Sequence, residues 1–266
     1  MIENRWRRRE DGVLVNELRI ILDDDDSQPP TTEELRHLIA EFSRSTQLAF
    51  ERYVRGRAEQ EGIDPERLLV KASAIKETIA LRGWYIDPEL TMRQLMKILV
   101  SFEAGREVEA DRMLSDYFDA SADSLCRDIC ALFPKRTAVI TDAFWAHENG
   151  KYTLAVPVFL AQSDGMVFEV FDRQLFSMRE GRPAVAPRID QLPHLTARML
   201  AALTIASPLF ASARDRVSPE QPLNRHTVLH GESVEYGTHF NSCKAMSLLN
   251  YVATSLGRYR DECQAG

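Results

Sequence analysis

Cysteine, glycine and proline are all scarce in this chain of 266 residues. Its four cysteines form no Cys-x-x-Cys pair and no regular framework, which excludes a disulfide scaffold and a cysteine-rich zinc module. We expect buried free thiols in a reducing cytosol, although Cys126 and Cys130 are spaced to face a common partner from one helix. Glycine and proline number 12 each, and the apolar residues between them recur at helical spacing. The chain is therefore expected to have an all-α fold.

Positive charge is also in deficit, because 33 lysines and arginines face 40 acidic residues and leave a net charge of −7. Such a balance argues against a sequence-blind nucleic-acid coat, so any attraction for RNA must be local. Hydrophobic residues make up 44% and charged residues 27%, which excludes wholesale disorder. No segment is expected to span a membrane, and the N-terminus is too polar for a signal peptide. We therefore predict a cytoplasmic protein without a membrane partner.

The N-terminal half is predicted to be a helical region of unknown role. Residues 1–30 are expected to form a polar, solvated lead-in that includes the basic cluster around Arg5 and the acidic run Asp23–Asp26. Helices are predicted over four segments: Thr31 to about residue 61, a segment that begins at Pro65, another that begins at Pro88, and 107–133. Pro134 with the basic pair after it suggests a boundary, which gives two domains, 1–133 and 134–266.

The C-terminal half is predicted to be a helical bundle. Helices are expected over residues 137–147, 152–171, 192–210, 219–230 and 239–261, with a loop over 177–190. In the last helix, apolar residues recur three and four apart, as in a helix packed in a bundle: Ala245, Leu249, Val252, Leu256 and Tyr259.

One short stretch, Pro222–Gly231, concentrates the residues that carry chemistry. Proline suits a helix start and glycine suits its C-terminal cap, so an arginine and two histidines lie on barely two turns. At 100° per residue, His226 and His230 are about 40° apart and share a face. Arg225 is about 140° from His230, but its side chain is long enough to curl toward the imidazole. The stretch offers one permanent cation and one or two groups that titrate near neutrality.

These residue types match what cleavage of RNA requires. The reaction needs a base for the 2′-hydroxyl proton, a proton donor for the leaving 5′-oxygen, and a cation for the pentavalent phosphorane. Histidine suits both proton transfers, and arginine matches phosphate oxygens in two-pronged geometry. Neither a metal nor a cofactor is expected, because the attacking hydroxyl already belongs to the substrate. DNA lacks that hydroxyl and would not be cut by this route.

The stretch Asn224–Gly231 resembles the Arg-x4–6-His motif of HEPN domains, in which a polar residue commonly follows the arginine. Flanking segments are similar to bacterial proteins with such domains, and the resemblance covers about half the chain, leaving residues 1–133 without a match. The similar segments are His147–Phe168 with Asp164, Leu223–Gly231, Tyr236-Gly237-Thr238, Asn241-Ser242, Lys244-Ala245 and Leu248–Tyr251.

The resemblance implies a metal-independent endoribonuclease in a HEPN-like helical bundle. Many HEPN domains are ribonucleases of toxin–antitoxin, abortive-infection and CRISPR systems, and they usually dimerise so that two motifs meet. It implies RNA as substrate, a homodimer, an antitoxin or defence-complex partner, and products with a 2′,3′-cyclic phosphate and a 5′-hydroxyl. It implies that His230 is the catalytic acid or base and that Arg225 stabilises the phosphate. Asn224 and His226 would orient the substrate or the other histidine. Tyr236 and Asn241 would lie at the mouth of the cleft, and Asp164 would be a carboxylate that orients a histidine.

Two other functions fit the same residues. The bundle could be a non-catalytic RNA-binding or assembly module of a defence complex, which the acidic balance and the unexplained N-terminal half favour. A third hypothesis is regulation by nucleotidyl modification, for which Tyr236 would be the acceptor.

Each site residue also has a purely structural interpretation. His230 could complement the helix dipole, and Arg225 could pair with Glu220 or Glu232. His226 and His230 have the spacing of a helical zinc pair, but no glutamate of an HExxH motif and no third ligand accompany them. Asp164 could be a satisfied carboxylate of the bundle. The aromatic residues Trp84, Phe144 and Trp145 are expected to belong to the core.

Overall fold

The computed structural model describes residues 2–8, 14–20, 55–56, 59, 64, 79–87, 89–192, 200–211 and 223–265. The chain divides into two compact units, Met1–Arg57 and Ala58–Gly266. Most of the two helices expected to begin at Thr31 and Pro65 lies outside the described residues.

The first unit contains an antiparallel hairpin of β1 (Ile2–Arg8) and β2 (Leu14–Ile20). Its register places Arg5 opposite Glu17, so residues of opposite charge occupy facing positions, a favourable cross-strand pairing. A polar lead-in to a helical region was expected here, and the two strands correct that expectation. In β2, apolar Leu14, Leu18 and Ile20 recur at even spacing, which is the period of a strand.

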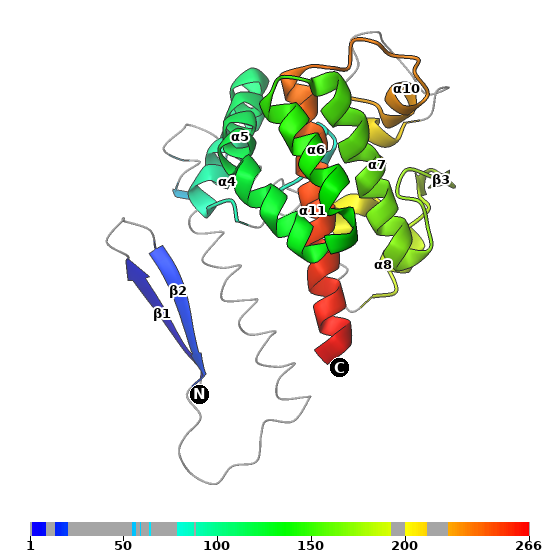
Figure 1. The fold of residues 1–266 in the computed structure, drawn as a ribbon. Coiled ribbons are helices and arrows are strands. Elements are labelled where there is room, and N and C mark those ends of the chain that lie inside the picture. Colours follow the sequence, from blue (N-terminus) through cyan, green and yellow to red (C-terminus); the bar gives the residue numbers. More distant parts are fainter. Residues whose placement is uncertain are drawn as a thin grey trace. The chain divides into compact units, whose positions relative to one another are not determined.

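Four helices of the second unit form a closed ring in which each contacts the next (Figure 1). They are α5 (Glu107–Leu132), α6 (Thr137–Glu148), α7 (Tyr152–Phe171) and α11 (His239–Ala265). The 3-10 turn η1 (Pro134–Arg136) joins α5 to α6, and a short turn at Asn149–Lys151 joins α6 to α7. The all-α prediction is therefore correct for this unit.

The helix ring crosses the predicted domain boundary. A division between residues 133 and 134 would separate α5 from α6 and α11, yet α5 contacts both along the bundle. The structure instead places the division between the compact units after Arg57. Pro134 opens a turn between two neighbouring helices of one bundle, which is why it looked like a boundary in the sequence.

Helix α4 (Met92–Glu103) packs on α5 and closes one end of the unit. It begins after Thr91, whose side chain accepts from the Gln94 backbone N–H while Gln94 bonds back, a complete capping box. The expected start at Pro88 was therefore a few residues too early. Before it, the indole of Trp84 is fully buried and donates to Asp111 at 2.8 Å.

The core lies inside the ring, and α11 supplies much of it. The predicted apolar stripe of α11 is buried from Ala245 to Leu256, whereas Tyr259 at its end is half-buried. Trp84 and Phe144 belong to the core as expected. Trp145 does not, because it points away from the ring and is 56% exposed.

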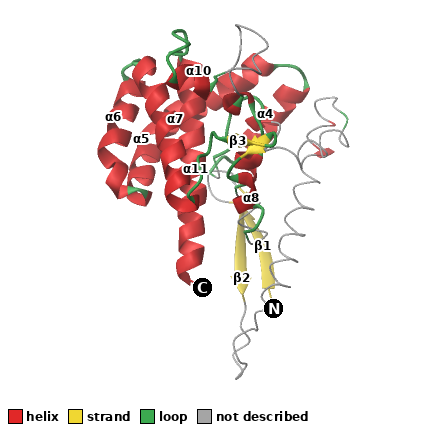
Figure 2. Ribbon diagram, turned by 90° about the vertical axis from the view of Figure 1, so that its right-hand side faces the viewer, coloured by secondary structure: helices red, strands yellow, loops and turns green. Residues whose placement is uncertain are grey.

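A long connection between α7 and α11 runs along one side of the ring (Figure 2). The expected loop over 177–190 contains a hairpin whose strands have two residues each, followed by one helical turn. In the expected helix 192–210, the described part has only two 3-10 turns. The connection comprises β3 (Met178–Arg179), β4 (Arg182–Pro183), α8 (Ala186–Ile189), η2 (Ala201–Thr204), η3 (Pro208–Phe210) and α10 (Arg225–Leu229). Pro208 and the alternation of small and apolar residues favour these short turns over one helix.

By length and composition alone, α7 would be able to cross a membrane. The expectation that no segment reaches this length was therefore wrong. In the compact unit α7 contacts α6, α10 and α11, and 44% of its most apolar window is buried. A core helix of a soluble protein satisfies the same criteria, so its length does not decide where the protein resides.

Candidate functional site

The two histidines of α10 lie together at its C-terminal end. The ring centroids of His226 and His230 are 4.3 Å apart, as their spacing on one helical face predicts. His230 is the C-terminal cap of the helix and is exposed, and the side chain of His226 is 30% exposed. The Nε2 atom of His226 lies 3.3 Å from a carboxylate oxygen of Glu232. Two solvent-accessible imidazoles, one of them oriented by a carboxylate, are therefore available for proton transfer.

Arg225 begins the same helix and is half-buried. Its guanidinium carbon lies 5.3 Å from the ring centroid of Phe176, a cation–π contact that holds the side chain against the connection. Its Nε atom is buried without a hydrogen-bond partner among the described residues. Of the two acids considered as partners, Glu232 faces His226 and Glu220 lies outside the described residues. The arginine is thus held in place by an aromatic ring, and its Nε–H has no acceptor among the described residues.

Asn224 is buried and positions α10 rather than facing solvent. Its Oδ1 accepts from the Thr227 backbone N–H at 3.1 Å, which caps the helix. Its Nδ2 donates to the backbone oxygens of Pro208 and Ala211, both at 3.0 Å. Both ends of the amide are occupied by backbone, so the expected role in orienting substrate falls to neighbouring residues.

Tyr236 and Asn241 fasten the loop that follows α10. The Tyr236 hydroxyl donates to the backbone oxygen of Thr153 in the first turn of α7. The Asn241 side chain, in the first turn of α11, donates to the Tyr236 backbone oxygen at 3.0 Å. Gly237 lies so close to Thr153 that an added Cβ would be 2.3 Å from its methyl group. Tyr236 and Asn241 therefore attach the loop to α7 and α11, and their described hydrogen bonds go to backbone oxygens rather than to the residues of α10.

Asp164 does not orient a histidine among the described residues. Its Oδ1 accepts from the Leu175 backbone N–H at 2.6 Å, which ties α7 to the segment that follows it. That segment carries Phe176, the ring on which Arg225 lies. The satisfied-carboxylate interpretation is therefore the one that the structure favours, and Asp164 acts on Arg225 only through this segment.

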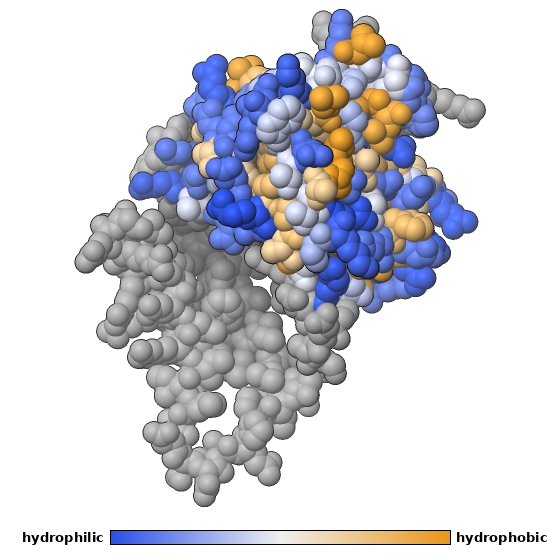
Figure 3. All heavy atoms as spheres, viewed as in Figure 1, coloured by the Kyte–Doolittle hydropathy of each residue, from blue (hydrophilic) through white to orange (hydrophobic). Residues whose placement is uncertain are grey.

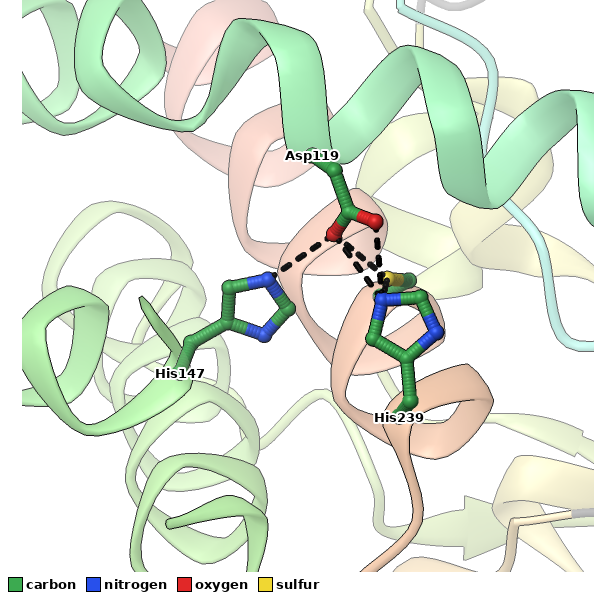
Figure 4. A group of neighbouring side chains, drawn as sticks. Asp119, His147 and His239 are labelled. Carbon is green, nitrogen blue, oxygen red and sulfur yellow. Dashed lines mark hydrogen bonds and ion pairs between the residues drawn. The ribbon is translucent and has the colours of Figure 1, made fainter. Parts of the chain in front are cut away.

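A second cluster, which the sequence reasoning missed, lies where α5, α6 and α11 meet (Figure 4). Asp119 of α5 is its hub: Oδ1 lies 3.1 Å from His147 Nε2 and 3.4 Å from Cys243 Sγ, and Oδ2 lies 2.8 Å from His239 Nε2. The sulfur also lies 3.6 Å from His239 Nε2. All four ligand-type atoms are within 4.8 Å of one another. We call these four residues the Asp-His-His-Cys cluster.

The cluster is buried on one side and open on the other. Cys243 and His147 are buried, and burial lowers the pKa of the His147 imidazole against the opposing pull of Asp119. Burial and the Asp119 charge raise the pKa of the Cys243 thiol far above its usual range. Asp119 and His239 border an open cavity of about 350 Å³. The protein alone therefore holds Cys243 as a neutral thiol, not as a nucleophilic thiolate.

Part of this cluster left a signal in the sequence. His239 and Cys243 are four residues apart at the start of a correctly predicted helix, a spacing that puts two ligands on one face. Asp119 and His147 come from two other helices, and only the ring arrangement brings them to the same place.

When the chain is compared with known proteins, no protein-family model, no curated protein and no solved structure matches it. The likeness to HEPN domains therefore depends on the residues of the α10 stretch and its flanking helices.

Proposed function

We propose that the protein is a metal-independent endoribonuclease whose reaction centre is formed by Arg225, His226 and His230 of α10. The observation that carries this proposal is the 4.3 Å separation of the two imidazoles at the exposed end of the helix. Metal-free cleavage of RNA needs two proton carriers near one phosphodiester, and histidine serves both roles. His230 alone, the histidine of the Arg-x4-His motif, could serve as either the proton acceptor or the proton donor, and the other role would remain unfilled.

The two histidines take opposite parts in the reaction. One, neutral, accepts the proton of the 2′-hydroxyl as the 2′-oxygen bonds to phosphorus. The other, protonated, donates its proton to the 5′-oxygen as the bond from phosphorus to that oxygen breaks. The products are a 2′,3′-cyclic phosphate and a 5′-hydroxyl end. Glu232, which lies 3.3 Å from His226 Nε2, orients that ring for its part.

Arg225 supplies the permanent charge. As the phosphorane forms, negative charge accumulates on its equatorial oxygens, and a guanidinium held in advance stabilises it without reorganisation. The contact with Phe176 provides that preorganisation, and the chain from Asp164 through Leu175 holds the ring. Asn224 fixes the helix start from which Arg225 projects.

We further propose that the active form is a homodimer. On the face shown in Figure 3, hydrophobic residues run along α7. Leu154, Ala161 and Phe168 are seven residues apart, which places them on one face of the helix, and all three are exposed. Trp145 of α6 is also exposed, at 56%. A second copy packed on this stripe would bury these exposed apolar side chains. The resemblance to bacterial HEPN proteins supports a cytoplasmic effector of anti-phage defence, restrained by an antitoxin or complex partner.

Cleavage of a single-stranded RNA in the presence of EDTA tests the ribonuclease proposal, with circular dichroism to show that the chelated protein stays folded. We expect 2′,3′-cyclic phosphate ends, no cleavage of the same RNA with 2′-deoxy linkages, and loss of activity in His230→Ala, His226→Ala and Arg225→Ala. Arg188→Ala is the matched control, because Arg188 is an exposed arginine of α8. Full activity of the folded His226→Ala and His230→Ala variants would disprove the assignment.

A non-catalytic RNA-binding or assembly module is the second candidate. The net charge of −7 favours it. The side chains of Asn224, Tyr236 and Asn241 also favour it, because they form hydrogen bonds to backbone oxygens instead of facing an open cleft. RNA that is bound but not cut by the folded wild-type dimer would support this module. Binding would then weaken in Arg225→Ala and remain in His230→Gln.

A further inference from the structure

We propose that the Asp-His-His-Cys cluster binds one Zn²⁺ ion, held by Asp119 Oδ, His147 Nε2, His239 Nε2 and Cys243 Sγ. Carboxylate oxygen, imidazole nitrogen and thiolate sulfur are the atom types that bind zinc in proteins, and here they come from α5, α6 and α11. The proposal is independent of the reaction assigned to α10, because no residue of the cluster belongs to that helix.

The separations between the ligand atoms fit tetrahedral coordination. With bonds of about 2.0 Å to nitrogen or oxygen and about 2.3 Å to sulfur, neighbouring ligands of a zinc ion lie about 3.3–3.6 Å apart. The sulfur lies 3.4 Å from Asp119 Oδ1 and 3.6 Å from His239 Nε2, which matches this range. His147 Nε2 lies 3.1 Å from Asp119 Oδ1, and all four atoms are within 4.8 Å. The wider separations among the four atoms, up to 4.8 Å, would have to shorten through side-chain rotation when the ion binds.

The ligand set also balances charge. One carboxylate, one thiolate and two neutral imidazoles carry two negative charges, which cancel those of Zn²⁺ and make a half-buried site electrically neutral. On binding, the metal–sulfur bond forms as the S–H bond of Cys243 breaks, and one proton is released to solvent. The imidazoles stay neutral and bind through Nε2 with the proton on Nδ1.

A neighbouring hydroxyl is placed to fix that tautomer for His147. Ser242 is buried, and its Oγ lies 2.7 Å from His147 Nδ1, so it can accept a hydrogen bond from Nδ1–H while Nε2 faces the metal. Zinc-bound histidines almost always have such a partner. Ser242 therefore acts as a positioning residue rather than a ligand.

The cavity beside the cluster gives a cation a route to the site. Its lining includes two of the proposed ligands besides Asp119, namely His147 and His239, and the acids Asp123 and Glu148. No lysine or arginine is among these described lining residues, and three of them are carboxylic acids. Asp119, Asp123 and Glu148 therefore concentrate negative charge around the cavity, and a divalent cation would offset it.

With four protein ligands the ion would be structural rather than catalytic. It would clamp the middle of α5 to the C-terminal end of α6 and to the first residue of α11, His239. The loop from His230 to His239 ends at that ligand and is fastened by Tyr236 to α7. The clamp would therefore also fix one end of the segment that follows the α10 histidines.

Titration of the chelated full-length protein with Co²⁺ and Zn²⁺ tests the proposal. We expect one ion per chain, intense visible bands of four-coordinate Co²⁺, a thiolate-to-cobalt charge-transfer band, and about one proton released per ion. Zn²⁺ should displace Co²⁺ and raise the melting temperature. These readouts do not depend on RNA cleavage, so this proposal and the ribonuclease proposal can fail separately.

Variants locate the site. Asp119→Asn and His239→Asn change the two ligands that are not buried, with the least effect on folding, and should weaken Zn²⁺ binding by more than about 100-fold. Cys243→Ser should remove the charge-transfer band, and Ser242→Ala should weaken binding about 10–100-fold. Cys126→Ser, Cys130→Ser and the double variant His226→Asn/His230→Asn are matched controls and should bind as tightly as wild type.

Three results would overturn the proposal. The first is wild-type protein that does not compete for Zn²⁺ with a micromolar chelator. The second is unchanged affinity in folded Asp119→Asn and His239→Asn. The third is a Co²⁺ spectrum without thiolate ligation, or one that the His226→Asn/His230→Asn double variant abolishes. In each case the cluster would be a hydrogen-bonded network around Asp119.

Discussion

At the scale of single residues, Asn224 shows how a buried amide holds the α10 stretch in place. Asn224→Ala removes the helix cap and leaves the carbonyls of Pro208 and Ala211 without their donor. We expect a loss of about 1–3 kcal/mol in the free energy of unfolding, measured by urea denaturation. Asn224→Asp keeps the acceptor but points an oxygen at two carbonyls, so it should cost at least as much.

Asn149 provides the control for this prediction. Its side chain donates to the Trp145 backbone oxygen at the exposed end of α6, where water can replace the bond. Asn149→Ala should therefore change stability by less than about 0.5 kcal/mol. Equal losses in the two alanine variants would contradict a special role for Asn224.

Cys126 carries a prediction about pH. Burial, reinforced by its neighbour Cys130, raises the pKa of the Cys126 thiol to about 11. At pH 8 only about one thiol in a thousand would be ionised, so alkylation by iodoacetamide should be on the order of 100-fold slower than for a free cysteine. The rate should rise about tenfold per pH unit toward pH 11. Mass spectrometry of the labelled peptide measures it.

Cys130→Ser tests the cause of this slow reaction. Because Cys130 contributes to the raised pKa of Cys126, its replacement should lower that pKa and speed the alkylation at pH 8. Rapid labelling of Cys126 at pH 8 in the wild-type protein would show that the thiol is not shielded. Both cysteines are free thiols, but the expectation that they are buried was wrong, since both are half-buried.

At the scale of elements, the exposed stripe of α7 predicts how two copies associate. Ala161 lies at the centre of the stripe, between Leu154 and Phe168. Ala161→Glu places a charge in the proposed interface and should convert the dimer to a monomer, as measured by light scattering after size exclusion. Ala131→Glu is the matched control, because Ala131 is an exposed alanine of α5. A wild-type monomer, or a protein that sediments with lipid vesicles through α7, would rule out the interface.

Long, periodic helices were predictable from the sequence, and short segments between them were not. Helices α5, α6, α7 and α11 match their predicted ranges closely, because each has a continuous apolar stripe and a clear start or stop signal. Pro157 lies only six residues into α7 and does not interrupt it. The predicted helix 219–230 reduces to five described helical residues, because Asn224 begins α10 and Gly231 ends it.

The same distinction between local and tertiary signals applies to the residues of the candidate sites. Local spacing sufficed to bring His226 and His230 together, because both lie on one helix. It failed for Asp164, whose partner is a backbone N–H eleven residues away, and for Asp119, whose partners lie on two other helices. Contacts made by tertiary packing leave no fixed spacing in one sequence.

At the scale of the whole molecule, the net charge of −7 constrains how RNA is held. A protein that bound RNA through a broad basic surface would lose affinity steeply as salt rises, by a slope of about −0.7 per phosphate contact on single strands. The proposed centre offers Arg225 and one protonated histidine, or about two contacts. The overall field meanwhile repels the polyanion. Salt dependence therefore separates a local site from an extended one.

We expect a slope of about −1.4 when the logarithm of the RNA association constant is plotted against the logarithm of salt concentration. Arg225→Ala should make the slope shallower by about 0.7, because one phosphate contact is lost. The full-length chain with Arg7, Arg8 and Arg9 changed to Gln should keep the wild-type slope, since these residues belong to the first unit and not to the centre on α10. Fluorescence anisotropy with a labelled RNA that carries 2′-deoxy linkages measures binding without cleavage. A wild-type slope steeper than about −4 that becomes shallow in the variant of Arg7, Arg8 and Arg9 would contradict this expectation. It would place RNA recognition in the N-terminal unit and leave only the cleavage chemistry to α10.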